Sequence, residues 1–124
     1  MTSACTILLV DDNEELRGTL AELFAGCGFE VLEAGSAEEA LSRFHEAGGD
    51  ISVVVTDVLL PGADGFWLLD RIRDSGRRPA QIVISSGSDH GTLRQRLERG
   101  ELAFLVKPFT LETLLSTVGA ARVS

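Results

Sequence analysis

Short apolar runs alternate with helical patterns along the whole chain, and this alternation limits the possible folds more than any other feature of the sequence. The runs predict strands near residues 6–10, 29–34, 51–56, 81–85 and 103–106. Between and after them, apolar residues recur at the spacing of amphipathic helices. Strands that alternate with helices typically form a parallel sheet with helices on both faces. The sequence therefore predicts an α/β fold.

Five helices are expected, one after each strand. In four of them the apolar faces are clear: Leu16, Leu20, Leu23, Phe24 and Cys27; Ala40, Leu41, Phe44 and Ala47; Phe66, Leu69 and Ile72; Leu111, Leu114, Leu115 and Val118. Ser36 and Glu39 form a capping box, in which each side chain can bond the other residue's backbone N–H. Thr110 is expected to cap the last helix. The helix near 92–99 has a thin apolar stripe, so we expect it to be loosely held.

The count of five strands and five helices matches the flavodoxin-like, doubly wound sheet with strand order 2-1-3-4-5. In open sheets of this kind, ligands bind at the carboxyl ends of the strands, where the strand order reverses. This point lies between the strand at 6–10 and the strand at 51–56. A chain of 124 residues has the size of one domain, so we expect a single domain over residues 1–124.

Charge and hydropathy exclude several classes of partner. The net charge of -8 argues against direct nucleic-acid binding, which needs clustered Lys and Arg. No apolar run approaches the roughly 18 residues of a membrane span, and the first residues lack the pattern of a signal peptide. We therefore expect a cytoplasmic protein that does not bind a membrane. The two cysteines form no CxxC motif and are expected to be reduced thiols.

Charged residues follow the strands at the edge where a ligand is expected. Asp11 and Asp12 follow the first strand, Asp57 follows the third, and Lys107 follows the fifth. Two carboxylates 4 Å apart repel by about 4 kcal/mol at an effective dielectric near 20, so three of them call for a divalent metal. Hard oxygen ligands and a nearby lysine indicate Mg²⁺ and a phosphoryl group.

Each acid taken singly has a simpler explanation, because Asp is common in turns and at helix starts. The combination is harder to explain in that way. The acids, the hydroxyl pair Ser85-Ser86 and Lys107-Pro108 all fall at the carboxyl ends of predicted strands. A purely structural explanation would have to treat this shared position as coincidence.

With these motifs the chain resembles the receiver domain of two-component response regulators, and the resemblance covers essentially all of it. The matching elements are Asp11-Asp12, the segment 57–65 with Pro61 four and Gly65 eight positions after Asp57, Ser86-Gly87, and Lys107-Pro108-Phe109. Together they form a specific signal.

The resemblance implies that Asp57 accepts a phosphoryl group from a phosphohistidine on a sensor histidine kinase or phosphotransfer protein. It implies that Asp12, Asp57 and the backbone carbonyl of Leu59 bind Mg²⁺, with Asp11 acting through bound water. Lys107 would neutralise a phosphoryl oxygen. A carboxylate is a competent nucleophile for this transfer, which otherwise needs positioning and charge neutralisation.

Two further residues would form the switch. Side-chain alternation does not decide between Ser85 and Ser86 as the hydroxyl that bonds the phosphoryl group. The family pattern of a hydroxyl followed by a small residue favours Ser86, because Gly87 follows it. Phe104 occupies the place of the family's aromatic residue that turns inward, and it fits equally well as a core residue of its strand.

The resemblance describes a signalling module that catalyses only its own phosphorylation and dephosphorylation, not a turnover enzyme. Its output surface would consist of the helix near 92–99, the strand at 103–106 and the last helix, and would contact a downstream effector. An Mg²⁺-dependent phosphatase of the aspartyl-phosphate type is the alternative, but it would need an acid where Leu59 stands. A flavin protein of the same fold would need a phosphate-binding loop where Asp11 and Asp12 stand.

Overall fold

The computed structural model describes residues 5–47, 50–77, 79–85, 103–107 and 109–122. Its elements are β1 (Thr6–Val10), α1 (Glu14–Gly26), β2 (Glu30–Ala34), α2 (Ala37–Ala47), β3 (Ile51–Asp57), α3 (Gly65–Asp74), β4 (Ala80–Ser85), β5 (Ala103–Val106) and α5 (Leu111–Arg122). The five predicted strands are present, with boundaries within one residue of those expected. The helix predicted near 92–99 lies outside the described residues, which contain the other four predicted helices.

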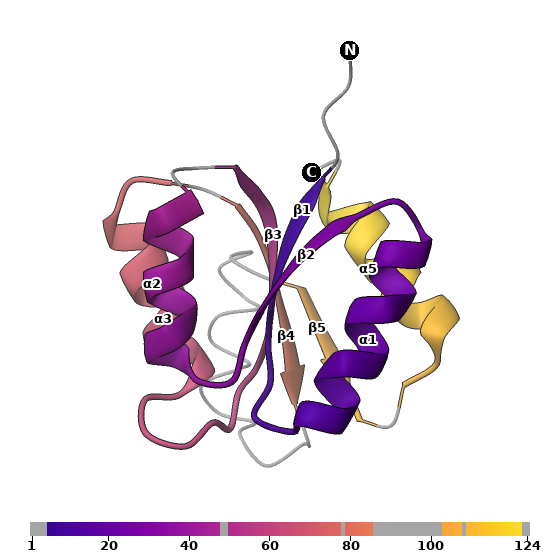
Figure 1. Cartoon of the computed structure of the whole chain (residues 1–124), viewed down its shortest axis with the longest axis horizontal. Coiled ribbons are helices and arrows are strands. Elements are labelled where there is room, and N and C mark those ends of the chain that lie inside the picture. Colours follow the sequence, from indigo (N-terminus) through magenta and orange to yellow (C-terminus); the bar gives the residue numbers. More distant parts are fainter. Residues whose placement is uncertain (1–4, 48–49, 78, 86–102, 108, 123–124) are drawn as a thin grey trace.

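The strands form one parallel sheet in the predicted order, β2-β1-β3-β4-β5. Helices α2 and α3 cover one face of the sheet, and α1 and α5 cover the other (Figure 1). The carboxyl ends of the strands are aligned across the sheet, in the pairs Val10–Thr56, Asp57–Ile84 and Ser85–Val106. Residues that follow the central strands therefore meet at one edge.

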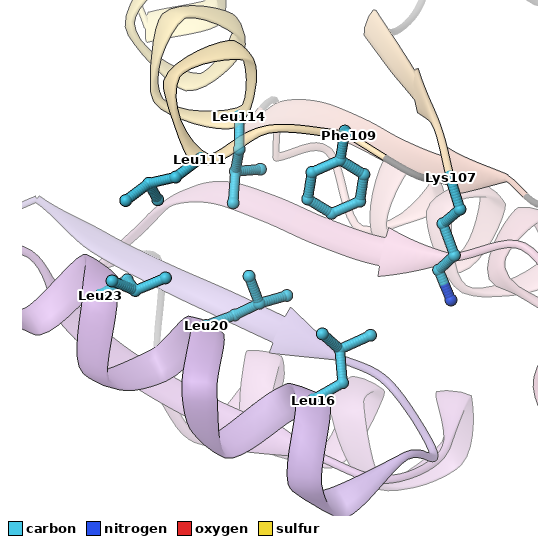
Figure 2. A pocket seen from close by; sticks show the side chains of 7 residues that line it. All are labelled: Leu16, Leu20, Leu23, Lys107, Phe109, Leu111 and Leu114. Atoms are coloured by element: carbon cyan, nitrogen blue, oxygen red, sulfur yellow. The ribbon is translucent and has the colours of Figure 1, made fainter.

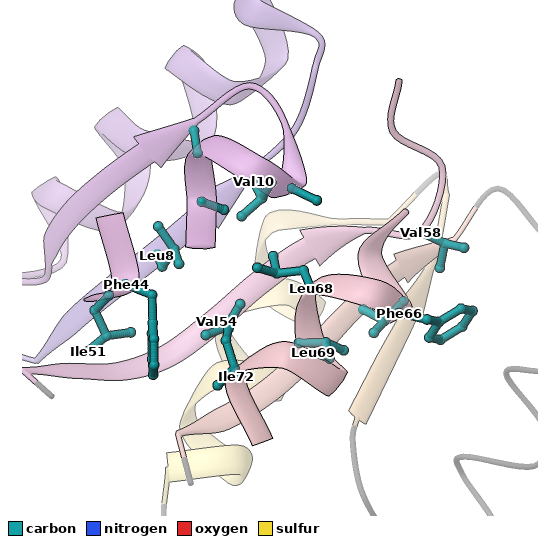
Figure 3. Close-up of a cluster of buried hydrophobic side chains, with 14 residues drawn as sticks. Leu8, Val10, Phe44, Ile51, Val54, Val58, Phe66, Leu68, Leu69 and Ile72 are labelled. Carbon is teal, nitrogen blue, oxygen red and sulfur yellow. The ribbon is translucent and has the colours of Figure 1, made fainter. Parts of the chain in front are cut away.

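Alternating side chains of the strands fill two separate cores. Leu8 and Val54 point toward α2 and α3, while Ile7 and Val55 point toward α1 and α5. Figure 3 shows the first of these cores, in which Phe44 and the apolar face of α3 lie against the sheet. Every residue of β1 is buried, and from Ile7 to Val10 this central strand is a continuous apolar run with no polar face.

The helix caps follow the sequence prediction in part. Thr110 caps α5, where its hydroxyl accepts the backbone N–H of Thr113 at 3.1 Å. At α2, the hydroxyl of Ser36 accepts the N–H of Glu39 at 3.1 Å, as predicted. The reciprocal bond was predicted wrongly, because the carboxylate of Glu39 accepts the N–H of Gly35 at 2.7 Å and not that of Ser36. The first turn of α2 is thereby tied to the residue that follows β2.

Two other expectations can be compared with the structure. Both cysteines, Cys5 and Cys27, are free thiols. None of the described helices has both the length and the apolar character needed to cross a bilayer.

Candidate functional site

The three predicted acids converge at the carboxyl edge of the sheet. Asp11 and Asp12 follow β1, and Asp57 is the last residue of the neighbouring strand β3. One carboxylate oxygen from each acid lies within 4.8 Å of the others. Asp11 and Asp57 are buried, whereas Asp12 is exposed. The site is therefore an acidic cluster that opens to solvent on the side of Asp12.

Lys107 supplies a cation to this cluster from the end of β5. Its Nζ donates a hydrogen bond of 2.8 Å to Oδ2 of Asp57. Burial alone would lower the pKa of Lys107, but the hydrogen bond and the negative charge of Asp57 raise it overall, with smaller contributions from Asp11 and Asp12. The ammonium therefore stays charged at neutral pH. Three carboxylates and one ammonium leave a formal charge of −2, which a divalent cation would neutralise.

Asp11 is the buried acid of the cluster of which only one carboxylate oxygen has a hydrogen-bond partner among the described residues. Its Oδ1 accepts the N–H of Asn13 at 2.9 Å. Its Oδ2 is buried and has no hydrogen-bond partner among the described residues. Burial raises the pKa of Asp11, despite the bond from Asn13. A buried oxygen without a partner is costly, and this one fits a metal ion or a metal-bound water. The all-oxygen donor set suits Mg²⁺.

The loop after β3 and the start of α3 both contact Asp57. Oδ1 of Asp57 accepts the backbone N–H of Leu59 at 3.4 Å, so the Leu59 backbone lies beside the carboxylate. A Cβ added to Gly65 would lie only 2.3 Å from the backbone oxygen of Asp57. The start of α3 therefore packs directly against the end of β3, and only glycine fits there. Sequence comparison with the family identified Gly65, but the physical reason is visible only in the structure.

Arg17 is a site residue that the sequence reasoning missed. Its Nη1 donates to the backbone oxygen of Asp11 at 2.9 Å, and its Nε donates to Glu33 on β2 at 3.1 Å. The available signal was a basic residue on the helix that follows the acidic pair. Its contact with Glu33 depends on the register of β1 against β2, which the predicted strand order does not specify.

The predicted switch residues are only partly among the described residues. Ser86 lies outside the described residues, and Ser85 is the last residue of β4. Phe104 is 37% exposed and belongs to neither buried core, so the alternative that it is a core residue is wrong. Its inward-turning role stays a prediction.

An apolar cavity of about 590 Å³ lies beside the cluster, between α1 and α5. Figure 2 shows leucines of the two helices facing each other across it, with Phe109 and Lys107 toward one end. Its lining consists of Leu16, Leu20, Leu23, Lys107, Phe109, Leu111 and Leu114. Because six of these seven residues are apolar, the cavity offers no second site for a phosphoryl group.

Comparisons with known proteins agree with this geometry. The family model described as "Response regulator receiver domain" matches residues 7–119. The chain is 33% identical over 118 residues to the sensor kinase CckA of Brucella abortus, and 34% identical over 119 residues to the DNA-binding transcriptional regulator NtrC of Azospirillum brasilense. These matches cover 95% and 96% of the chain but only 12% and 24% of the two relatives.

The fold is also similar to solved structures. A response regulator receiver domain protein from Clostridium thermocellum superposes with a TM-score of 0.89 at 28% identity. The superposition covers 96% of this chain and 94% of that protein. The chain therefore spans a small part of the curated relatives but nearly all of this solved domain.

Proposed function

The chain belongs to the family of response regulator receiver domains, and from this premise we propose that Asp57 is its phosphoacceptor. Domains of this family are signalling modules that interact with histidine kinases or phosphotransfer proteins and with effectors. The observation that carries the proposal is the position of the Asp57 carboxylate, which lies within the acid cluster and 2.8 Å from the ammonium of Lys107. The proposed nucleophile therefore lies within hydrogen-bond distance of a cation that can neutralise the phosphoryl group.

The proposed step is a transfer of a phosphoryl group from a phosphohistidine of the partner protein. A carboxylate oxygen of Asp57 forms the new bond to phosphorus, while the bond from phosphorus to the imidazole nitrogen breaks and the imidazole takes up a proton. Lys107 neutralises negative charge on the transferred group. The protein's main contributions are position and electrostatic stabilisation, as is general for phosphoryl transfer.

Members of the family bind Mg²⁺ at an acidic pocket, and the donor set of this chain fits that ion. We assign its binding to Asp12, Asp57 and the backbone carbonyl of Leu59, with Asp11 acting through bound water. When bound, the metal neutralises the carboxylates and polarises the phosphoryl oxygens. Two observations support this assignment: the charge of the cluster, and the buried Oδ2 of Asp11, which has no hydrogen-bond partner in the part of the chain that the structure describes.

The output is proposed to be a change of the surface formed by the helix near 92–99, β5 and α5. A new anion bonded to Ser86 and Lys107 would favour one of two conformations, and a few kcal/mol of differential interaction is enough for such a shift. Phe104 and Val106 are exposed on β5 and would form part of the surface that an effector contacts.

Phosphorylation by acetyl phosphate tests the assignment without a partner protein. In the presence of Mg²⁺, the intact mass of the parent should rise by one phosphoryl group, and Asp57→Asn should remain unlabelled. Asp74→Asn is a matched control, because Asp74 is exposed at the far end of α3. Equal labelling of Asp57→Asn, or labelling that survives excess chelator, would show that the assignment is wrong.

The same reaction separates the module from a phosphatase. A signalling module should accumulate its phosphorylated form and release phosphate slowly, whereas a phosphatase would release phosphate rapidly without accumulating that form. Amide NMR shifts with a phosphate analogue test the output surface. Changes confined to residues 11–60 would contradict the proposed surface.

A further inference from the structure

The side chain of Arg17 connects Glu33 on β2 to Asp11, the residue that follows β1. Nη1 donates to the backbone oxygen of Asp11 at 2.9 Å, and Nε donates to Oε1 of Glu33 at 3.1 Å. The side chain is 17% exposed, so this ion pair is better shielded than the surface pairs of Arg43 and Arg71. Arg17 therefore links α1 and β2 to the loop that carries the acids.

The guanidinium lies close to the backbone of Gly35. A Cβ added to Gly35 would lie 3.2 Å from Nη1 of Arg17, so the guanidinium packs against the backbone just after β2. Gly35 is itself held by the bond from its N–H to Glu39. A planar guanidinium that is packed on one side and bonded at two nitrogens holds its acceptors in a fixed geometry.

This contact completes the set of bonds that fix Asp11. Its backbone N–H donates to Ala34 at 3.1 Å, its backbone oxygen accepts from Arg17, and Oδ1 of its carboxylate accepts from Asn13. The carbonyl of Asp11 lies in the same rigid peptide plane as the nitrogen of Asp12. Fixing that carbonyl therefore fixes the direction in which the chain enters Asp12.

We propose that Arg17 is a positioning residue of the divalent-metal site, and that its bridge between the Asp11 carbonyl and Glu33 holds Asp11 and Asp12 in the geometry that binds Mg²⁺. This inference rests on the proposed function, which places Mg²⁺ at the acid cluster. Arg17 does not touch the metal or the phosphoryl group. It acts through the backbone of Asp11.

The sign of one substitution distinguishes positioning from simple electrostatics. A guanidinium beside a cation site repels the cation, so removal of its charge should strengthen Mg²⁺ binding if charge alone mattered. Positioning predicts the opposite, because the freed loop would lose its arrangement. Loss of an outer partner of a metal site typically costs 10–100-fold in affinity, and we expect about tenfold for Arg17→Gln.

The test is the dissociation constant of Mg²⁺, measured by calorimetry at constant ionic strength and well below the melting temperature. Arg17→Gln should raise it about tenfold. Arg17→Lys should raise it as well, because a single ammonium does not reproduce the two-nitrogen bridge although it keeps the charge. Arg71→Gln removes an equal charge and an exposed ion pair on α3, and should leave the constant unchanged. An unchanged or lower constant for Arg17→Gln would overturn the inference.

A second readout separates positioning from general loss of stability. At saturating Mg²⁺, Arg17→Gln should be phosphorylated by acetyl phosphate at the parent's rate, while at low Mg²⁺ it should be slower. A purely structural defect would slow labelling equally at both concentrations, which would contradict the inference. Glu33→Gln serves as the milder variant should Arg17→Gln fail to fold, and it should weaken Mg²⁺ binding in the same direction. If Asp12→Ala binds Mg²⁺ as tightly as the parent, the proposed metal site itself fails, and that result is distinguishable from a failure of Arg17 alone.

Discussion

Strand β1 and the two residues that follow it differ in how their groups are satisfied. Ile7 through Val10 are buried, apolar and paired with β2 on one side and β3 on the other. Directly after them, Asp11 is buried with one carboxylate oxygen that has no partner among the described residues, and Asp12 is exposed beside two other carboxylates. The buried residues of β1 therefore stabilise the fold, whereas the two acids that follow the strand destabilise it.

A comparison of free energies shows that burial in the strands can offset the repulsion among the acids. Full burial of one Leu, Ile or Val side chain contributes about 1.5–3 kcal/mol. Each pair of carboxylates at 4 Å costs about 4 kcal/mol at an effective dielectric near 20. A few buried residues of the sheet therefore offset the repulsion at its edge. The comparison teaches that the interior must be rigid so that the edge can hold groups that repel one another.

The largest expected effect is a loss of interior packing. Leu69→Ala should lower the free energy of unfolding by about 2–5 kcal/mol, because Leu69 is fully buried in the core under α2 and α3. Leu59→Ala is the same substitution at a side chain that is 53% exposed beside Asp57, and should change it by about 0.5 kcal/mol or less. Urea denaturation in chelator measures both. Equal costs would break the contrast between interior and edge.

The second effect is stabilisation of the edge by metal. Mg²⁺ at a hundredfold excess over its dissociation constant should stabilise the parent by about 2.7 kcal/mol, because it binds the folded cluster and not the unfolded chain. In metal-free buffer near neutral pH, Asp12→Ala should raise the melting temperature and abolish the response to Mg²⁺. Should Asp12→Ala instead lower the melting temperature and still respond to Mg²⁺, Asp12 would be a turn or cap residue.

The third effect concerns the contact between the interior and the edge. Gly65→Ala should cost about 1–3 kcal/mol of stability, because the new Cβ would overlap the backbone oxygen of Asp57. It should also slow labelling by acetyl phosphate, since the end of β3 must shift. Gly18→Ala is the control, because its Cβ would meet nothing within 4 Å in α1. This control should stabilise by about 0.5–1 kcal/mol. Equal losses in thermal denaturation would show that the contact at Gly65 is unimportant.

The smallest effect is a pH dependence caused by Asp11. Burial raises the pKa of Asp11 in the folded state above its ordinary value, so its charged form disfavours folding at neutral pH. As the pH falls through the raised pKa, Asp11 takes up a proton and this penalty disappears. Asp11→Asn should therefore be more stable than the parent at neutral pH without metal, and the difference should shrink as the pH falls. A difference that grows in acid would contradict the direction of the shift.

The sheet could be predicted from sequence because short, mostly apolar runs alternate with helical patterns, although β2 carries Glu30 and Glu33. The predicted strand order places Asp11, Asp12 and Asp57 at one edge of the sheet, and the structure brings them together there. Lys107 could be predicted in the same way, because it follows the last run. These predictions needed only the rule that parallel strands end at a common edge.

Individual side-chain contacts outside the acid cluster could not be predicted in this way. The bridge from Arg17 to Glu33 joins residues sixteen positions apart, and the bond from Glu39 to Gly35 depends on the path of the chain after β2. The exposure of Phe104 follows from its place on an edge strand of only four residues. So short a strand has too little alternation to show which of its faces is covered.

The alignment of the strands makes chain length a determinant of function. Asp57 pairs with Ile84, one step beyond the pair of Val10 with Thr56, so the position of each acid depends on the number of residues counted along its strand. A deletion of one residue within β3 would place a different side chain at this point and turn its neighbours to the opposite face. Changes of length in the loops at the amino ends of the strands would leave the count intact. We therefore expect the site to tolerate insertions and deletions in the loops at the amino ends of the strands. Insertions and deletions within the strands should destroy the site.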